Sequence, residues 1–206
     1  MSFIETEIKY LLSKENFRCL YNHLKQYYKN PSLIRQVNYY FDSADLYMQQ
    51  HRINIRIRFI KGMSELTCKI PIDDSTQDNI QNSYEYNVTI TREEALGYIK
   101  NGLSSLSLLE HFGDMFKHHD LVADDTICYG HLRTARIHFS IQDNLAPLLL
   151  DINTYLGIFD YELEWELTEV EAANEILQGL FETLTISPIG QMEPKRKRFF
   201  KQLIII

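Results

Sequence analysis

The sequence has very few cysteines. The 206 residues include only Cys19, Cys68 and Cys128, an odd number of thiols that stand far apart in the chain. Their spacing excludes the zinc and redox motifs that depend on closely spaced cysteines, and it gives no basis for a disulfide-stapled fold. We therefore expect three free thiols in a reducing compartment.

Long apolar runs are also missing. The apolar stretch 203–206 is far too short to cross a bilayer, which takes roughly 20 residues. The first residues lead into a strand-like pattern and lack the basic start and apolar run of a secretory signal. These absences predict a cytoplasmic protein with no membrane partner.

The chain has no excess of positive charge. It carries 21 Lys and Arg against 28 Asp and Glu, a formal net charge of −7. A general nucleic-acid binder is therefore not expected, because a domain-wide basic surface is needed to neutralise a phosphate backbone. A small phosphate ligand needs only a local basic cluster and remains compatible with this charge. No internal repeat or linker is visible, so we predict a single domain over residues 1–206.

What the sequence does contain is a series of short alternating segments and a few amphipathic ones. Lys61-Gly62 between two alternating segments predicts a hairpin. Ser13 and Thr91 each precede a helical pattern as capping residues, as does Thr168. We expect helices over 13–28, 91–102, 106–117 and 170–184, a loop over 71–82, and strands within 4–10, 33–41, 52–60, 65–70, 84–90, 127–132, 134–141, 148–153, 158–167 and 196–203. The fold class expected is α+β with many antiparallel strands.

The strands share one pattern: charged residues on one face and apolar residues on the other. In the first strand Glu5, Glu7 and Lys9 alternate with Ile4, Thr6 and Ile8. The same parity recurs in later strands, where the charged face carries Arg56, Arg58, Glu65, Lys69, Glu85, Arg136, Asp151, Glu162, Glu164 and Glu166, with Lys195 and Lys197 near the C-terminus.

Two interpretations fit that pattern. For any one strand, a charged face in water above an apolar core is the usual antiparallel arrangement. However, the signs here are sorted by strand, and Glu and Arg stand where Thr, Ser or Gln are common. We therefore favour a closed β-barrel whose charged faces point inward and whose apolar faces are covered by helices such as 13–28 and 170–184. So many inward charges would be costly to desolvate without a highly charged ligand.

A metal-bound polyphosphate is such a ligand. Glu5 and Glu7, about 7 Å apart along one face, can approach one hard cation from adjacent positions. Mg²⁺ and Mn²⁺ prefer carboxylate and phosphate oxygens. Arg and Lys side chains suit the remaining phosphate charge, Arg with a planar fork and Lys with a point charge.

These residues carry a resemblance to a known family. Glu5-Thr6-Glu7-Ile8-Lys9 resembles the E-x-E-x-K signature of the CYTH superfamily, the triphosphate tunnel metalloenzymes, and Asn38-Tyr39-Tyr40-Phe41-Asp42-Ser43 is similar to the N-x-Y-F-D-T element of that family. Further matches follow in order over essentially the whole chain: Arg56-Ile57-Arg58, Leu66-Thr67-Cys68-Lys69, Tyr84-Glu85-Tyr86, Gly130 with Thr134-Ala135-Arg136, Leu150-Asp151, 160–166 and 195–199. The resemblance implies a closed eight-stranded antiparallel barrel with flanking helices, a divalent metal and a small triphosphate substrate.

The resemblance also implies roles for individual residues. It places the metal on Glu5, Glu7, Asp151, Glu162 and Glu164, and the triphosphate on Lys9, Arg56, Arg58, Lys69, Arg136 and Lys195 or Lys197. Catalytic roles would fall to Lys9, Arg58, Glu85 and Asp151. The last basic segment departs from the S-K-x-x-R-F pattern of the family, with Pro194 where Ser is common, and this leaves the choice between Lys195 and Lys197 open.

Three functions are compatible with this reading. The favoured one is a Mg²⁺- or Mn²⁺-dependent hydrolase of inorganic triphosphate, thiamine triphosphate or a nucleoside triphosphate. The second is a class IV-type adenylate cyclase, which converts ATP to cyclic AMP and pyrophosphate. The third is a non-catalytic polyphosphate- or nucleotide-binding module, which four inward glutamates disfavour. The sequence does not rank the triphosphates or distinguish a monomer from a homodimer.

Overall fold

The computed structural model describes residues 2–28, 30–72, 79–142, 145–167, 170–189 and 193–205. The strands are β1 (Ser2–Leu12), β2 (Ser32–Asp42), β3 (Asn54–Ile60), β4 (Met63–Pro71), β5 (Ile80–Ile90), β6 (Ile127–Phe139), β7 (Leu148–Tyr155) and β8 (Ile158–Glu166). The helices are α1 (Lys14–Tyr27), α2 (Tyr47–Gln50), α3 (Arg92–Asn101), α4 (Ser105–His118), α5 (Val170–Leu184) and α6 (Lys195–Ile205). The predicted α+β class is confirmed.

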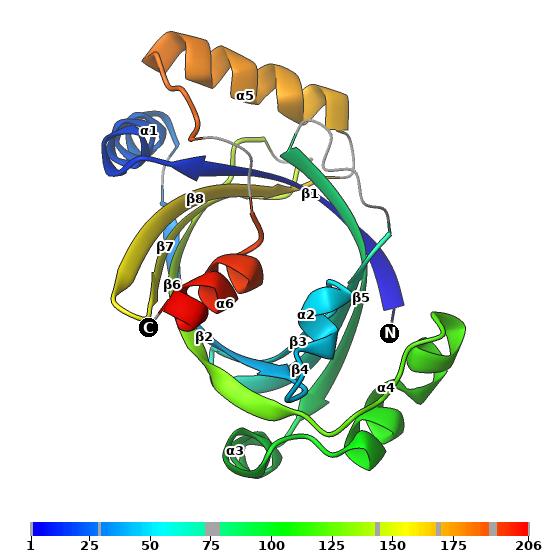
Figure 1. Ribbon diagram of the computed structural model, residues 1–206. Coiled ribbons are helices and arrows are strands. Elements are labelled where there is room, and N and C mark those ends of the chain that lie inside the picture. Colours follow the sequence, from blue (N-terminus) through cyan, green and yellow to red (C-terminus); the bar gives the residue numbers. More distant parts are fainter. Residues whose placement is uncertain are drawn as a thin grey trace. The chain divides into compact units, whose positions relative to one another are not determined.

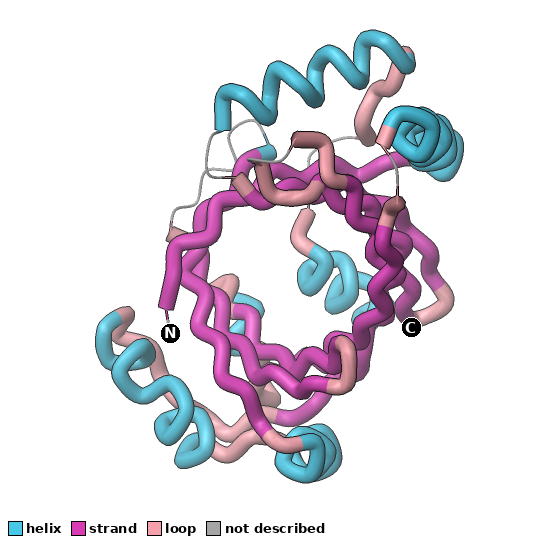
Figure 2. Tube along the Cα trace, turned by 180° about the vertical axis from the view of Figure 1, so that it is seen from behind, coloured by secondary structure: helices cyan, strands magenta, loops and turns pink. Residues whose placement is uncertain are grey.

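The eight strands form a closed antiparallel barrel in the order β1-β5-β4-β3-β2-β6-β7-β8 (Figures 1 and 2). The predicted hairpin joins β3 to β4 through Lys61 and Gly62, whose φ angles of 48° and 80° suit a tight turn that follows the strand twist. The barrel predicted from the charged faces and the family resemblance is therefore present.

The chain divides into two compact units, each with its own hydrophobic core. The first unit comprises Met1–Ile4, Gln36–Ile72 and Ser83–Leu132, and the second comprises Glu5–Arg35, Asp73–Asn82 and Arg133–Ile206. Each unit contains charged strand residues and helices that pack on the apolar side of its strands.

In the first unit, α3 packs on β4, and α4 contributes to the same core. Ile55 and Ile57 of β3 are fully buried against this core, which also contains Phe112 and Met115 of α4. The residues that alternate with these isoleucines, Arg56 among them, therefore lie on the face of the sheet away from the helices. The apolar face is buried as predicted.

In the second unit, α1 packs on both β8 and α5 (Figure 1). Trp165 of β8 and Leu20 of α1 are fully buried in one core, and Phe181 of α5 joins them. The predicted cover of the apolar strand faces by the helices within 13–28 and 170–184 is confirmed for this unit. Its charged side chains again alternate onto the opposite face.

The predicted helix starts at Ser13 and Thr91 are confirmed. Ser13 Oγ accepts a hydrogen bond from the Asn16 backbone N–H, and Thr91 forms a reciprocal capping box with Glu94. The start predicted at Thr168 lies outside the described residues.

The prediction of a strand over 196–203 is wrong, because this segment is helix α6. Phe199 and Phe200 are both fully buried, which alternation cannot achieve on one strand face but adjacent positions on a helix can. The two strands predicted over 127–132 and 134–141 form one strand, β6, and β5 begins at Ile80, inside the segment expected to be a loop. Among the described residues, no helix is long and apolar enough to span a membrane.

Candidate functional site

The charged face of the second unit is a buried cluster of carboxylates and cations. We call it the carboxylate face, and its members are Glu7, Lys9, Arg136, Asp151, Glu162, Glu164 and Lys195. Strand register brings the members together, since Arg136 pairs with Asp151, Asp151 with Glu162, and Lys9 with Glu164. The side chains of Asp151 and Glu162 are 0% exposed, which rules out the water-facing interpretation for them.

Lys195, the first residue of α6, lies at the centre of this face. Its Nζ is 2.7 Å from Asp151 Oδ2, 2.5 Å from Glu164 Oε1 and 3.1 Å from Glu162 Oε2. A single ammonium thus contacts three buried carboxylates, each from a different position on β7 and β8. The position of Lys195 Nζ is one that a cation with oxygen ligands would favour.

Arg136 and Lys9 also pair with these carboxylates. Arg136 donates from Nε to Asp151 Oδ1 at 2.9 Å and from its second guanidinium nitrogen to both Asp151 and Glu164. Lys9 Nζ lies 2.5 Å from Glu7 Oε1 and 3.4 Å from Glu164 Oε1. Glu162 Oε1 is buried and has no hydrogen-bond partner among the described residues.

The pKa values of this cluster follow from burial and charge. Burial alone would lower the pKa of Lys9, but Glu7 and Glu164 outweigh it and raise that pKa above its ordinary value. Burial raises the pKa of Glu162, and the neighbouring cations offset only part of that effect. For Glu164 the balance is reversed, because Lys195, Lys9 and Arg136 together hold its pKa well below the ordinary value despite burial.

The charged face of the first unit contains ion pairs with long N–O distances. We call it the basic face, and its members are Arg56, Arg58, Lys69 and Glu85. Arg56 and Lys69 lie 3.8 Å and 3.7 Å from the oxygens of Glu85, compared with the 2.5–2.7 Å of several pairs on the carboxylate face. Arg58 donates to Asn38 Oδ1 at 3.1 Å and lies 3.8 Å from Glu65. Arg56, whose ion pair with Glu85 is long, is therefore able to strengthen its contacts with an added anion.

The lowered pKa of Glu85 predicts that the folding stability of the protein depends on pH. Burial would raise its pKa, but Arg56 and Lys69 outweigh burial and lower the pKa from 4.5 to about 2. A depressed folded-state pKa contributes stability above the unfolded value, and that contribution, about 3 kcal/mol, is lost as the pH falls from 4.5 to about 2. Chemical denaturation at pH 6 and pH 3 should therefore show a smaller loss for Glu85→Gln than for the wild type. Exposed Glu93→Gln is the control, and an equal acid loss in all three proteins would contradict the pairing.

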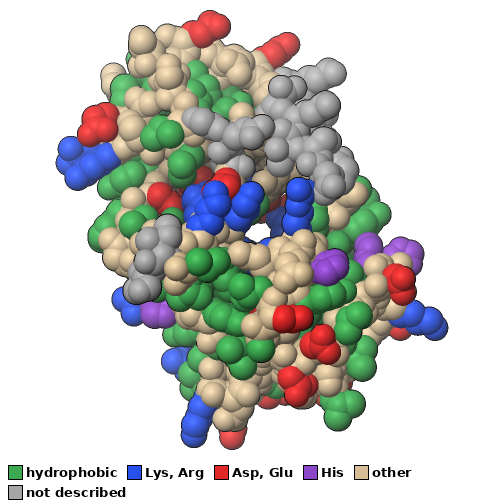
Figure 3. Space-filling model, in the orientation of Figure 1, with side chains coloured by type: hydrophobic (Ala, Val, Ile, Leu, Met, Phe, Trp, Pro, Cys, Tyr) green, Lys and Arg blue, Asp and Glu red, His purple; other side chains and the backbone are tan. Residues whose placement is uncertain are grey.

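Basic side chains are also visible from outside. Figure 3 shows a group of Lys and Arg side chains gathered on the face of the molecule in view, whereas Asp and Glu are scattered over it.

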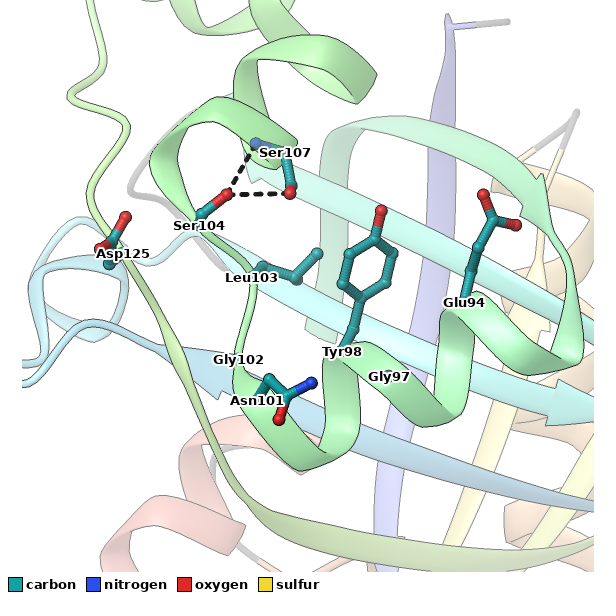
Figure 4. A pocket seen from close by; sticks show the side chains of 9 residues that line it. All are labelled: Glu94, Gly97, Tyr98, Asn101, Gly102, Leu103, Ser104, Ser107 and Asp125. Atoms are coloured by element: carbon teal, nitrogen blue, oxygen red, sulfur yellow. Dashed lines mark hydrogen bonds between the residues drawn. The ribbon is translucent and has the colours of Figure 1, made fainter.

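A hollow of about 410 Å³ lies in the first unit beside α3 and α4 (Figure 4). Its lining includes Tyr98, Ser104 and Asp125 but none of the predicted site residues. Ser104 caps α4 there, accepting from the Ser107 backbone N–H, and Asp125 accepts from the Ser105 backbone N–H, so these groups are explained by the helix start.

Comparison with known families decides what kind of domain this is. The family model described as the CYTH domain matches residues 4–197. The chain belongs to the CYTH domain family. A curated relative, "Putative triphosphatase YjbK" of Bacillus subtilis (strain 168), is 27% identical over 200 residues, covering 97% of this chain and 95% of the relative.

Solved structures give the same fold for this CYTH domain. A Bacillus halodurans protein described as a "putative adenylate cyclase" has a TM-score of 0.74 and 28% identity, and the match covers 97% of this chain and 98% of that one. A Hippeastrum protein, "Putative adenylyl cyclase HpAC1", described as having a dominant triphosphatase activity, has a TM-score of 0.79 at 23% identity. That match covers 96% of this chain and 95% of the Hippeastrum chain, and it shows the shared fold.

The CYTH domain brings together most of the residues that the sequence singled out. Glu7, Lys9, Arg136, Asp151, Glu162 and Glu164 share the carboxylate face, while Arg56, Arg58, Lys69 and Glu85 share the basic face. Glu5 lies on β1, two residues before Glu7, and is half-buried. Lys195 and Lys197 separate clearly: Lys195 is in the cluster, whereas the Lys197 side chain is 56% exposed and lies 3.2 Å from Glu193.

The sequence reasoning missed Arg198. Its guanidinium donates to Glu162 Oε2 at 2.8 Å and to Asp160 Oδ2 at 3.0 Å, and its side chain is only 10% exposed. The spacing of Lys195 and Arg198 could have indicated this role, because residues three apart share one face of a helix. The assumption of a strand placed Lys195 and Lys197 on one face instead.

The donor set of the carboxylate face fits a hard divalent cation. Asp151, Glu162 and Glu164 supply buried carboxylate oxygens around one cationic position, and Glu162 Oε1 has capacity for one more contact. Within the described ranges, no three His, Cys, Asp or Glu side chains already surround a metal-sized position, which agrees with Lys195 lying among these carboxylates. Loading of a metal therefore requires the Lys195 ammonium to leave them.

Proposed function

We propose that this CYTH domain is a Mg²⁺- or Mn²⁺-dependent hydrolase of a small triphosphate. The observation that carries the proposal is that the chain has two different charged faces. One concentrates buried carboxylates with oxygens suited to a metal, and the other carries cations suited to phosphate. The relative from Bacillus subtilis, named "Putative triphosphatase YjbK", supports the same activity.

In this proposal the cations hold the phosphate chain. Arg56, Arg58 and Lys69 contact it from the basic face, and Lys9, Arg136 and Lys195 from the carboxylate face. Arg56 Nε is buried with no hydrogen-bond partner among the described residues, so it has a donor to offer. These contacts position the triphosphate and spread its charge, which is most of what phosphoryl transfer requires from a protein.

The carboxylates hold the metal and the water. Glu5, Glu7, Asp151, Glu162 and Glu164 are the proposed metal ligands. When bound, Mg²⁺ or Mn²⁺ would neutralise charge on the phosphate oxygens as the P–O bond breaks. The water oxygen bonds to phosphorus, the bridging P–O bond breaks toward the leaving phosphate, and a carboxylate of the site accepts the water proton. We assign the catalytic roles to Lys9, Arg58, Glu85 and Asp151, in a cytoplasmic protein that needs no nucleic-acid or membrane partner.

A cyclase is the second candidate, favoured by one observation. The Bacillus halodurans protein, 28% identical over 97% of this chain, is described as a "putative adenylate cyclase". Product analysis separates the candidates. The protein is incubated with Mg²⁺ or Mn²⁺ and with ATP, thiamine triphosphate or inorganic triphosphate. Release of orthophosphate supports the hydrolase, cyclic AMP with pyrophosphate supports the cyclase, and tight binding without turnover supports a binding module.

Arg58→Ala is expected to lower kcat/KM for the hydrolysed triphosphate by about a hundredfold, because a positioned charge on the phosphates is lost. The fold should persist, since Arg58 belongs to neither hydrophobic core. Arg133→Ala on β6 is the matched control, because Arg133 is exposed. Equal kinetic constants for the Arg58→Ala variant and the wild type would contradict the role given to the basic face.

A further inference from the structure

One end of the basic face has buried polar atoms with no hydrogen-bond partner in the described part of the chain. Ser83 is 4% exposed, and its Oγ has no hydrogen-bond partner among the described residues. Asn54 Oδ1 is also buried and unpartnered within that part of the chain. Native proteins satisfy the great majority of buried polar atoms, so two such atoms on one face of the sheet require an explanation.

Strand register places both residues beside the proposed phosphate-binding cations. Asn54 on β3 is opposite Lys69 on β4, and Lys69 is opposite Glu85 on β5. Ser83 lies two residues before Glu85 and therefore points to the same face of the sheet. Asn54 likewise shares its face with Arg56, two residues further along β3.

Three neighbouring polar side chains of this face are hydrogen-bonded to one another. Thr67 Oγ1 donates to Asn87 Oδ1 at 2.7 Å, and Asn87 Nδ2 donates to Glu85 Oε1 at 2.8 Å. The basic face can thus build complete hydrogen bonds from its own side chains. The unpartnered atoms of Asn54 and Ser83 stand apart from this chain of bonds, at the end of the face near Lys69.

Their chemistry indicates what is missing. Asn54 Oδ1 accepts hydrogen bonds only, and a serine hydroxyl can both accept and donate. Fully ionised inorganic triphosphate has only acceptor oxygens, so it cannot satisfy Asn54. An organic triphosphate with hydroxyl or amino groups can place its phosphates on Arg56 and Lys69 and a donor on Asn54.

We propose that Asn54 and Ser83 form a specificity subsite that binds the organic group of the substrate through an O–H or N–H donor. The substrate class is then an organic triphosphate, such as a nucleoside triphosphate, and inorganic triphosphate is the poorer substrate. This inference rests on the proposed triphosphatase function and names its substrate class.

The test compares substrates in Ser83→Ala and Asn54→Ala. The wild type is first assayed with ATP and with thiamine triphosphate to find the preferred organic substrate. For that substrate, kcat/KM should fall about tenfold in each variant, the usual effect of one lost neutral hydrogen bond. For inorganic triphosphate, kcat/KM should stay within about twofold, because no contact to it is removed. Equal losses for both kinds of substrate, no loss for either, or a wild type that prefers inorganic triphosphate would overturn the subsite.

Thermal unfolding separates a binding role from a structural one. Ser83→Ala should not lower Tm, because that variant removes no hydrogen bond within the protein. Thr67→Val is the matched control and should lower Tm, since it leaves Asn87 without its donor. A lower Tm for Ser83→Ala would assign that hydroxyl to the fold and overturn the proposal.

Binding measurements keep this test distinct from the test of catalysis. If the wild type turned over none of the triphosphates, the proposed function would fail. Calorimetry with a non-hydrolysable ATP analogue and with inorganic triphosphate would still report on the subsite. Weaker binding of the ATP analogue alone in Ser83→Ala supports the subsite, and unchanged or equally weakened binding of both ligands overturns it.

Discussion

Lys195→Ala is expected to lower Tm by about 10 °C in metal-free buffer, and Mn²⁺ is expected to restore much of that loss. Lys195 contacts Asp151, Glu162 and Glu164, all deeply buried. Removing one partner from a buried ion cluster costs about 3–5 kcal/mol, because the remaining charges are left uncompensated. For a protein of this size, each kcal/mol corresponds to roughly 2–4 °C in Tm.

The rescue by metal is the distinctive part of this prediction. Without the ammonium, the three carboxylates are available to a divalent cation, and a ligand that binds only the folded state raises its stability. Mn²⁺ should therefore raise Tm more in Lys195→Ala than in the wild type. Lys197→Ala is the control on the same helix, since Lys197 is exposed and should change Tm by little. A large Tm loss without rescue by Mn²⁺ would contradict the assignment of these carboxylates to a metal.

Glu164→Gln is expected to reduce turnover at least about a thousandfold, with side-chain shape nearly preserved. Glu164 contacts Lys195 at 2.5 Å and Lys9 at 3.4 Å, and it also pairs with Arg136. The substitution removes a proposed metal ligand and frees three cations from their shared carboxylate. Loss of a metal ligand withdraws the charge neutralisation on which phosphoryl transfer depends.

Steady-state kinetics and Mn²⁺ binding should change together in that variant. The Mn²⁺ affinity measured by calorimetry is expected to fall along with kcat, whereas Glu175→Gln on α5, an exposed position, should leave both unchanged. A folded Glu164→Gln variant with wild-type turnover would remove Glu164 from the metal site. Loss of turnover with unchanged Mn²⁺ affinity would assign it a role toward the cations instead.

The barrel and its two charged faces were predictable because strand alternation is a local property of the sequence. Arg56 and Arg58 alternate with Ile55 and Ile57, so the burial of the isoleucines fixes the direction of the arginines. The resemblance to the CYTH family was recognised because its motifs occur in the same order along this chain. The family model matches residues 4–197. The alternation of charged and apolar residues along a strand is thus enough to predict which side chains share a face.

The pairing within each face was not predictable, because it depends on contacts between distant segments. The sequence left open whether Lys195 or Lys197 belongs to the site, and it did not predict that Lys195 lies among the carboxylates expected to hold metal. The reason is the wrong secondary structure expected for this segment. The segment after Pro194 is short and rich in both basic and apolar residues, and a short window does not separate a strand from a helix. Once α6 is recognised as a helix, Lys195 and Arg198 fall on one side of it.

The contrast between tight and loose ion pairs also lies beyond the sequence. Glu85 and Glu164 are both acidic residues on alternating strands, yet Lys195 lies 2.5 Å from Glu164, whereas Lys69 and Arg56 lie 3.7 Å and 3.8 Å from Glu85. Asn54 Oδ1 and Ser83 Oγ are recognised as lacking a partner among the described residues only after the partners of all buried polar groups have been identified. Distances of this kind are set by packing around the face.

The most direct test of the central claim is the location of the metal. Crystals grown with Mn²⁺ and a non-hydrolysable triphosphate analogue should give an anomalous difference peak bonded to carboxylate oxygens among Asp151, Glu162 and Glu164. In that crystal, Lys195 Nζ should have left these oxygens and should contact a phosphate. A Mn²⁺ peak away from the carboxylate face, with Lys195 still bound to all three carboxylates, would contradict the account.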